Sequence, residues 1–439
     1  MKIAIVTNFL YPEGIGGTEI YCQQLATALV ERGNEVYWFV PNFNQSTTHI
    51  ELRGKGINIV KFAGVDPEQQ TSLAFTKESF IREMQSRNIS IAHFHEFGGD
   101  DGISPELLPA CKQAGIATVV TFHLANYICK TGTMHFGGVV PCNGKMILSR
   151  CSSCHLFSNK TASPVVNQLL AELFDPLLKI GLVRSIPRLI KFMDGINLKT
   201  AFISIIREHA DMVVSLTHWF RDVLMVNGIP EKHTIYIPQV SPAVDPGKFI
   251  SDTAERNGFV FIGRVDKQKG IDLILDIAKQ LKQQLPEAVI DVYGPSYGPY
   301  QAENRSMNWV YPNLDKYDNI RYKGFLQPAE VLSVMNKYKA VILPSLVAEM
   351  APLIIMEANA LKVPVVVSDV PGSAELTRQY DCGLVFKYGS SDDLLDKIMQ
   401  IERGKIKFSF KQPAQNSFYQ TAGIYETVYE NISKRTFNN

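Results

Sequence analysis

Short apolar runs alternate with longer amphipathic stretches along most of the chain. The runs predict β-strands at residues 2–7, 35–40, 89–95, 117–123, 210–216, 235–238, 259–262, 288–293, 320–324, 340–343 and 363–368. Helical periodicity separates many of them, as at residues 18–33 and 271–285. Strands that are apolar throughout are typical of parallel sheets covered by helices on both faces. The alternation therefore predicts an α/β protein.

The length of 439 residues exceeds one typical core, so we expect two domains. The first, at 1–245, is Rossmann-like, with a cysteine-rich insertion at about 126–156 and a helical segment at 156–210. A second Rossmann-like domain at 257–411 follows a linker that contains proline and glycine. We expect a C-terminal helix at 412–439 to pack back on the first domain. Two doubly wound domains that face each other across a cleft would bind a ligand between them.

Composition narrows the class of protein. A hydrophobic content of 46% and a charged content of 20% are typical of a globular protein. The net charge of +1 indicates no general attraction to nucleic acid. The first apolar run is too short for a signal peptide, and no run of 18 apolar residues predicts a membrane-spanning helix. We therefore expect a cytoplasmic protein whose seven cysteines are reduced.

Residues 345–359 follow one predicted strand and combine a loop with the start of a helix. Glu349 and Glu357 have seven residues between them, and Pro352 suits the first turn of a helix. The helix N-terminus would direct backbone N–H groups toward an anion such as a diphosphate, with both carboxylates near the hydroxyls of attached sugars. The alternative is an ordinary strand–helix unit with two solvated glutamates.

Two further loops carry groups suited to phosphate. Arg264 and Lys269 lie five positions apart after the strand at 259–262, where a guanidinium and an ammonium could bind a diphosphate. Gly16 and Gly17 precede the helix at 18–33 and permit close backbone approach, although their spacing is not that of a dinucleotide fingerprint. Taken alone, the loop with Arg264 and Lys269 could be a solvated basic turn, and the loop with Gly16 and Gly17 could be a plain tight turn.

Histidines end two of the predicted strands. His93 and His95 end the strand at 89–95, and for these two we favour structural roles. His123 ends the strand at 117–123 and is the better site candidate, because ligands of open α/β sheets bind at carboxyl ends of strands.

Four cysteines lie within 26 residues: Cys129, Cys142, Cys151 and Cys154. The last two form a C-x2-C pair, and four thiolates make a structural zinc site. His135 or His155 could replace one thiol. The alternative is four unrelated reduced cysteines in a loop.

Residues 177–193 contain four basic residues and no acidic one. Lys179, Arg184, Arg188 and Lys191 are interleaved with apolar positions, a pattern suited to a helix on an anionic membrane surface. Packing of the same apolar positions on the domain core is the alternative.

The combined motifs resemble family 4 glycosyltransferases of the GT-B fold. These motifs are G-G-T-E at 16–19, His123, S-x-x-H at 215–218, G-R-x-x-x-x-K-G at 263–270, and the glutamates Glu349 and Glu357. The resemblance implies retaining transfer of a hexose from a UDP- or GDP-sugar without a catalytic metal. It also implies that 257–411 binds the nucleotide-sugar, and some family members carry similar cysteine pairs.

The resemblance also implies a role for each matching residue. Arg264 and Lys269 would bind the diphosphate, Glu357 the ribose, and Glu349 and His123 the donor sugar. The remaining donor-binding candidates are Gly16, Gly17, Gly263, Met350, Ala351, Pro352 and Leu353. Pro352 replaces the glycine that many relatives carry, so one N–H donor is lost there. A reaction on one face of the sugar is favoured over a covalent intermediate on Glu349.

We expect a glycan or lipid-linked acceptor in the assembly of surface polysaccharide, such as lipopolysaccharide, or of glycolipid. Attachment to the inner face of the cytoplasmic membrane would accompany such an acceptor. The alternatives are a transferase with a soluble acceptor, a sugar-phosphate synthase, and a two-domain sugar-binding protein without catalysis.

Overall fold

The computed structural model describes most of the chain. The described residues are 1–10, 17–42, 49–53, 56–63, 77–98, 103–158, 164–179, 187–240, 256–295, 311–314, 316–404, 406–412 and 417–436. The predicted linker at 238–258 therefore lies mostly outside them. The predicted membrane segment at 177–193 also does, because 180–186 and the side chains on either side of that gap are not described.

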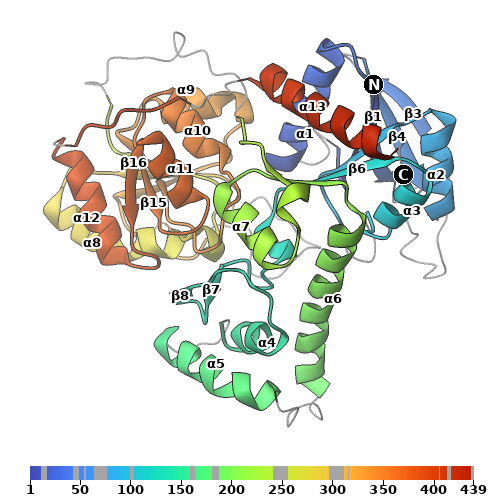
Figure 1. Cartoon of the computed structure of the whole chain (residues 1–439). Helices are drawn as coiled ribbons and strands as arrows, with labels where there is room; N and C mark the ends of the chain where they lie inside the picture. Colours follow the sequence, from blue (N-terminus) through green and yellow to red (C-terminus); the bar gives the residue numbers. More distant parts are fainter. Residues whose placement is uncertain are drawn as a thin grey trace. The chain divides into compact units, whose positions relative to one another are not determined.

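The chain divides into two compact units, each built on its own β-sheet (Figure 1). Unit 1 comprises Met1–Thr131, His135–Pro242 and Gln415–Asn439, and unit 2 comprises Gly132–Met134 and Ala243–Ala414. Both sheets are mainly parallel, with helices between successive strands. The predicted α/β class with two doubly wound units is confirmed.

Unit 1 contains an eight-stranded sheet in the order β10-β9-β6-β5-β1-β2-β4-β3. Its strands are β1 (Lys2–Val6), β2 (Glu35–Asn42), β3 (His49–Arg53), β4 (Ile57–Ala63), β5 (Ile91–Phe94), β6 (Ala117–Phe122), β9 (Met212–Ser215) and β10 (Thr234–Tyr236). Only β3 pairs antiparallel to its neighbour. The apolar-run pattern does not identify β3 and β4, because strands near a sheet edge carry polar residues among apolar ones.

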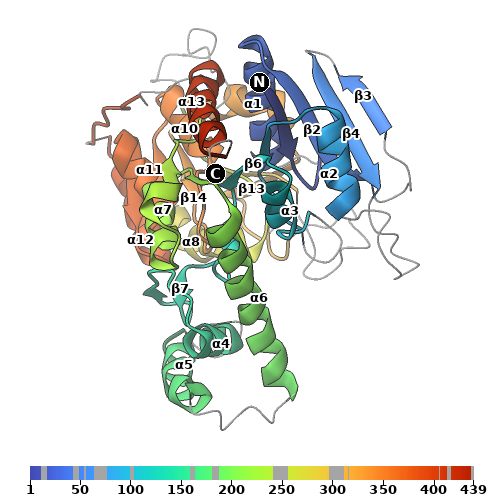
Figure 2. The same cartoon turned by 45° about the vertical axis from the view of Figure 1, so that its right-hand side comes forward.

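The helices of unit 1 are α1 (Gly17–Glu31), α2 (Lys77–Ser86), α3 (Leu107–Gln113), α4 (Leu148–Ser158), α5 (Pro164–Lys179), α6 (Pro187–His209), α7 (His218–Val226) and α13 (Phe418–Thr436). Figures 1 and 2 both show α6 running away from the sheet of this unit, with α4 and α5 at its far end. The helix α4 packs against both α5 and α6. These three helices form an arm, named here the helical arm. No helix among the described residues is long and apolar enough to span a bilayer.

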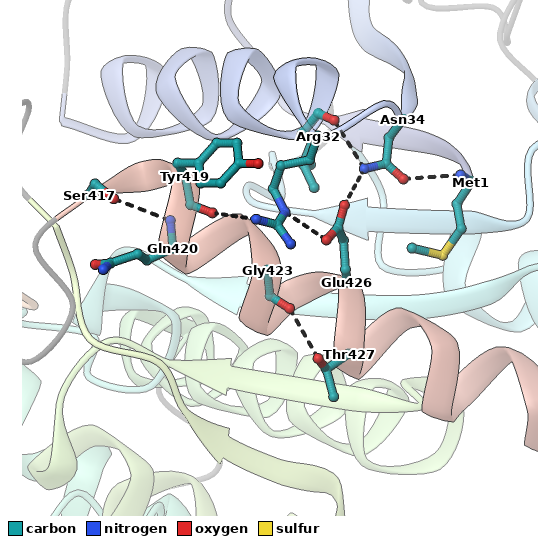
Figure 3. A network of polar contacts seen from close by, with 10 residues as sticks. Met1, Arg32, Asn34, Ser417, Tyr419, Gln420, Gly423, Glu426 and Thr427 are labelled. Carbon is teal, nitrogen blue, oxygen red and sulfur yellow. Dashed lines mark hydrogen bonds and ion pairs between the residues drawn. The ribbon is translucent and has the colours of Figure 1, made fainter.

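The last helix, α13, packs on α1 within unit 1. Arg32 Nε lies 2.7 Å from Glu426 Oε2, and Asn34 Nδ2 donates to Glu426 Oε1 at 2.5 Å (Figure 3). The N-terminal ammonium of Met1 donates to Asn34 Oδ1 at 3.0 Å, and the Arg32 guanidinium lies over the Tyr419 ring. These contacts join the last helix to the first strand and helix of the chain.

The C-terminal helix begins later than the predicted start at 412. Lys411 and Gln412 are not helical, and the Lys411 N–H donates to the Tyr380 carbonyl oxygen of unit 2 at 2.8 Å. The helix begins at Phe418.

A buried polar layer lies beneath α13. The Tyr429 hydroxyl lies 2.7 Å from His93 Nδ1, and His93 Nε2 lies 2.7 Å from Thr121 Oγ1. The hydroxyls of Tyr21 and Tyr425 lie 2.9 Å apart. Burial lowers the pKa of His93 well below its usual value, so the ring is neutral. Both of its nitrogens have hydrogen-bond partners. His93 therefore has the structural role expected for it.

Unit 2 contains a six-stranded parallel sheet in the order β13-β12-β11-β14-β15-β16. Its strands are β11 (Phe259–Ile262), β12 (Ile290–Tyr293), β13 (Ile320–Gly324), β14 (Ala340–Leu343), β15 (Val365–Ser368) and β16 (Gly383–Phe386). Its helices are α8 (Ile271–Gln284), α9 (Val331–Met335), α10 (Leu353–Ala360), α11 (Ser373–Tyr380) and α12 (Ser391–Glu402). Along the chain, β11, β12 and β13 follow one another toward one edge of the sheet, and β14, β15 and β16 then follow one another toward the other edge. Ligands of such sheets bind at the carboxyl ends of the two strands where the order reverses.

The buried hydroxyl of Tyr429 gives a test of the layer beneath α13. Tyr429→Phe removes the partner of His93 Nδ1 and leaves a buried polar atom unpaired, so we expect a loss of about 1–3 kcal/mol in the free energy of unfolding. Tyr419→Phe makes the same chemical change on an exposed side chain of the same helix and serves as the control. Urea unfolding measures both; equal effects of the two substitutions would contradict this account of the layer.

Candidate functional site

In unit 2 the loop after β11 contains a short 3-10 turn, η5 (Lys267–Lys269). Asp266 caps this turn, since its Oδ1 accepts a hydrogen bond from the Lys269 backbone N–H at 2.8 Å. Gly270 follows with a φ of +76°, and a Cβ on it would lie 1.8 Å from the Pro344 carbonyl oxygen. Only glycine allows the loop after β11 to lie this close to the loop after β14.

That close approach brings Lys269 and Glu349 together. Lys269 Nζ lies 2.5 Å from Glu349 Oε1, and Ser345 Oγ donates to the same oxygen at 2.6 Å. Burial raises the pKa of Glu349, but the Lys269 ammonium, the Ser345 hydroxyl and the Arg264 charge outweigh it and hold the pKa below its usual value. Glu349 is therefore an ionised, largely buried carboxylate at neutral pH.

Arg264 is the second cation of this site. Its guanidinium is about half exposed and lies 3.3 Å from Asp266 Oδ2, measured from Nε. Its charge also acts on the Glu349 carboxylate. Gly263, beside it, forms part of the close contact between the loops after β11 and β12, because a Cβ on Gly294 would meet the Gly263 carbonyl oxygen at 1.8 Å.

A third loop, after β15, holds the Glu349 backbone. The Glu349 N–H donates to the Pro371 carbonyl oxygen at 3.1 Å. Gly372 has a φ of +86°, and a Cβ on it would lie 1.6 Å from the Glu349 carbonyl oxygen. The sequence reasoning missed Gly372 and Ser345; the V-P-G run after the predicted strand at 363–368 is the signal that could have identified the first.

The helix α10 begins at Leu353, so Pro352 is its N-cap residue and not part of its first turn. Pro352 has φ −64° and ψ 119°, an extended conformation that ends the loop. Met350 is buried, whereas Ala351 and Pro352 are half-buried in the same loop. The loop therefore leads directly to the N-terminal end of α10, where N–H groups lack helical partners.

Glu357 lies in the second turn of α10 and differs from Glu349 in its electrostatics. Burial raises the pKa of Glu357 to about 7. The two glutamates of the motif thus differ in protonation. Neighbouring cations hold Glu349 ionised, whereas Glu357 titrates near neutral pH.

In unit 1 the strand order reverses between β1 and β5. Gly17 begins α1, and a Cβ on it would meet no other atom within 4 Å; Gly16 lies outside the described residues. Glu96 directly follows β5 and His95, is buried, and its Oε2 accepts from the Asn8 N–H at 3.1 Å. Burial raises the Glu96 pKa to about 7, with a further contribution from Glu19. The sequence reasoning missed Glu96, although its position after a strand-ending histidine could have indicated it.

His123 directly follows β6 and lies against His95. His95 Nδ1 and His123 Nε2 are 3.0 Å apart, and the Tyr21 ring packs edge-on against His123. Burial lowers the pKa of His95 well below its usual value and that of His123 to about 3. Both rings are therefore neutral; one donates to the other, and each fixes the tautomer of its partner.

Cys22 completes a group of three candidate metal ligands with His95 and His123. Their ligand atoms lie within 4.8 Å of one another. The facing nitrogens of the two rings already share a hydrogen bond, and burial raises the pKa of the Cys22 thiol well above its usual value. A metal ion bound to this group would have to replace that hydrogen bond and ionise the thiol.

The four clustered cysteines all lie in unit 1, are half-buried and form no disulfide bonds. Cys151 and Cys154 are on α4, Cys142 directly follows β8 (Val140–Pro141), and Cys129 follows the 3-10 turn η1 (Ala125–Tyr127). The cysteines of the predicted insertion at about 126–156 thus come from two loops and one helix of unit 1.

The geometry defines an α/β protein with a candidate anion site at the point where the strand order of unit 2 reverses. Two family models match the chain: the model for glycosyl transferases group 1 at residues 248–418, and the model for Glycosyltransferase Family 4 at residues 15–139. The chain belongs to the family 4 glycosyltransferases of the GT-B fold, as its motifs predict.

Two curated proteins are similar over part of their length. The chain is 26% identical over 149 residues to the amylovoran biosynthesis glycosyltransferase AmsK of Erwinia amylovora, covering 33% of this chain and 35% of that protein. It is 23% identical over 194 residues to glycosyltransferase 1 domain-containing protein 1 of Xenopus tropicalis, covering 41% of this chain and 54% of that protein. The chain thus spans about half of one relative and about a third of the other.

Solved structures match over nearly the whole chain. Sucrose-phosphate synthase from Thermosynechococcus elongatus has a TM-score of 0.58 at 15% identity, with 100% of this chain and 97% of that chain covered. Anabaena HepE in complex with UDP-glucose has a TM-score of 0.57 at 14% identity, with 100% and 98% covered. At these identities the likeness shows the fold.

The raised pKa of Glu357 predicts a pH-dependent stability. Between its ordinary pKa of 4.5 and about 7, the folded state holds a proton that the unfolded state has lost, so stability falls as pH rises through this range. Glu357→Gln removes this titration. The stability of the ligand-free variant relative to the parent protein should therefore rise between pH 5 and pH 8, by about 3 kcal/mol at most.

Denaturant unfolding at several pH values measures this difference. Glu287→Gln replaces an exposed glutamate of the same unit and is the matched control. A difference between Glu357→Gln and the parent protein that does not grow with pH would contradict the effect of burial on this carboxyl group.

Proposed function

We propose that the protein is a retaining glycosyltransferase that transfers a hexose from a UDP- or GDP-sugar to a lipid-linked or glycan acceptor. The observation that carries the proposal is the ion pair of Lys269 with Glu349, with the Arg264 charge within electrostatic reach, where the strand order of unit 2 reverses. A nucleoside diphosphate needs cations held in place in advance, and this site supplies two beside the N-terminal end of α10.

The donor would bind with its diphosphate at Arg264, Lys269 and the N–H groups that precede and begin α10. Glu357 would accept hydrogen bonds from ribose hydroxyls in its ionised form. Anabaena HepE, a structure of the same fold, is known in complex with UDP-glucose, which supports a nucleotide-sugar donor. Side-chain cations and the helix end would neutralise the departing diphosphate, so no catalytic metal is part of the proposal.

The state of Glu349 supports a reaction on one face of the sugar. Its Oε1 already accepts hydrogen bonds from Lys269 and Ser345, which makes the carboxylate a weak nucleophile and a good acceptor for sugar hydroxyls. In the proposed step the bond from the anomeric carbon to the diphosphate oxygen breaks, and the acceptor oxygen bonds to that carbon from the same side. The acceptor proton passes to the departing diphosphate.

The helical arm supports an acceptor at a membrane surface. Val166, Leu169 and Leu173 recur at three- and four-residue spacing on one side of α5, and their exposed fractions are 44%, 54% and 67%. Leu198 on α6 is 72% exposed. The basic residues of 177–193 begin with Lys179 at the end of α5 and continue in the sequence into α6. Apolar side chains beside basic ones favour an anionic bilayer surface.

Such a surface fits an enzyme of surface polysaccharide or glycolipid assembly, whose lipid-linked acceptor stays in the bilayer. AmsK is named for amylovoran biosynthesis, and the lipopolysaccharide outer core galactosyltransferase WaaB has the same fold, with a TM-score of 0.52. A soluble acceptor, as for sucrose-phosphate synthase, is the second candidate. The first would place the protein on the inner face of the cytoplasmic membrane.

Substitution of the cation pair tests catalysis. Arg264→Ala and Lys269→Ala should each remove on the order of 2–4 kcal/mol of transition-state stabilisation, or roughly 30- to 1000-fold in kcat. Lys267→Ala removes an exposed ammonium from the same turn and should leave turnover nearly unchanged. The assay measures release of nucleoside diphosphate from a panel of nucleotide-sugars. Full activity in both variants, or strict dependence on Mg²⁺ or Mn²⁺, would rule out the proposed mechanism.

Flotation with anionic vesicles tests the membrane surface. The parent protein should float at low salt, whereas Leu169→Gln/Leu173→Gln and charge reversal at Arg184 and Arg188 should each weaken binding at least about tenfold. Phe325→Gln replaces an exposed apolar residue of unit 2 and is the matched control. A parent protein that stays in the soluble fraction, or variants that float like it, would contradict binding to the membrane surface and favour a soluble acceptor.

A further inference from the structure

We propose that Cys129, Cys142, Cys151 and Cys154 bind one structural zinc ion beside α4 of the helical arm. The four cysteines are half-buried and form no disulfide bonds, and they come from three separate segments between β6 and α6. Four cysteine sulfurs are a common ligand set of structural zinc. The site is independent of sugar transfer, so it can fail while the proposed function stands.

The sulfurs gather around Cys151. Cys151 and Cys154 are three residues apart on α4, so their side chains lie on the same face of the helix. Charges on Cys142, Cys129 and Cys154 would each act on the Cys151 thiol. Three other thiols therefore lie within electrostatic reach of this one.

Metal binding would draw the sulfurs closer together. Zinc–sulfur bonds of about 2.3 Å in a tetrahedron separate the sulfurs by about 3.8 Å. Among the described residues, three candidate ligand atoms lie within 4.8 Å of one another only at Cys22, His95 and His123. Zinc binding at the cysteine site therefore requires the sulfurs to move closer together than they lie in this structure.

Backbone amides around the cysteines are arranged for thiolates. Three amides donate to these sulfurs: Gly144 to Cys142 at 3.4 Å, Gly137 to Cys154 at 3.3 Å, and Ile147 to Cys151 at 3.5 Å. Gly144 and Gly137 have φ values of +78° and +60°, so their N–H directions depend on turns that favour glycine. A neutral thiol accepts hydrogen bonds weakly, whereas a metal-bound thiolate gains much more from them.

Two lysines lie where they offset the charge of such a site. A zinc ion with four thiolates carries a net charge of about −2. Lys199 on α6 donates to the Asn126 carbonyl oxygen, and its ammonium lies within electrostatic reach of Lys130 and Cys129. Lys130 follows Cys129 directly, so two ammonium groups accompany the first ligand.

The strands around the cysteines are short. β7 (His135–Phe136) and β8 have two residues each, and the Arg150 guanidinium lies over the Phe136 ring at 4.5 Å. A zinc ion would fasten the loops after β6 to α4.

Elemental analysis of the full chain, purified without chelator, tests the proposal. We expect about one zinc per chain, released when a mercurial reagent modifies about four thiols. Cys151→Ser/Cys154→Ser should lose the metal, whereas Cys111→Ser, at a buried cysteine of α3, should keep it. Cobalt in place of zinc should give the visible absorption of tetrahedral thiolate coordination.

Background zinc in the parent protein, or full zinc in the double variant, would overturn the proposal. If the double variant does not fold, the parent protein decides: peptide mapping should find the mercurial on these four cysteines when zinc is released. Release while all four remain unmodified would also overturn the proposal.

Discussion

The close approach of two loops at the carboxyl ends of β11 and β14 is the constraint on which the candidate site depends. A side chain at Gly270 would overlap the Pro344 carbonyl, so the loops can lie together only because that residue is glycine. Their contact places the Lys269 ammonium against the Glu349 carboxylate, 80 residues apart in the chain. The reversal of strand order makes these two loops neighbours, and the glycine sets how close they lie.

Burial then gives the two motif glutamates different chemistry. Both lose solvation, which favours the neutral acid in each. At Glu349 a neighbouring ammonium, a hydroxyl and a guanidinium reverse that preference, whereas at Glu357 burial acts alone. A carboxyl group whose charge is disfavoured in the free protein gains from a ligand that donates hydrogen bonds to it. The site therefore carries a cost in stability that ligand binding can offset.

In unit 1 several buried polar side chains are hydrogen-bonded to one another. His93, Thr121 and Tyr429 satisfy one another beneath α13, and His95 and His123 form a second buried pair. Each ring nitrogen that faces a hydrogen-bond partner is held by that partner, which fixes the orientation of these neutral rings. The salt bridge between Arg32 and Glu426 holds α13 over this layer. A helix from the end of the chain thus stabilises residues at the carboxyl ends of β5 and β6.

The sequence alone determined the α/β class and the bounds of buried strands such as 259–262 and 340–343, because parallel strands covered by helices on both faces are apolar throughout. It also identified the loops with Arg264, Lys269 and Glu349, since their residue types suit a diphosphate. It could not identify Glu96, Ser345 or Gly372, whose roles come from contacts with residues far away in the chain. The start of α13, the edge strands β3 and β4, and the opposite states of Glu349 and Glu357 were likewise decided by the tertiary structure, because desolvation and close backbone approach exist only after the chain has folded.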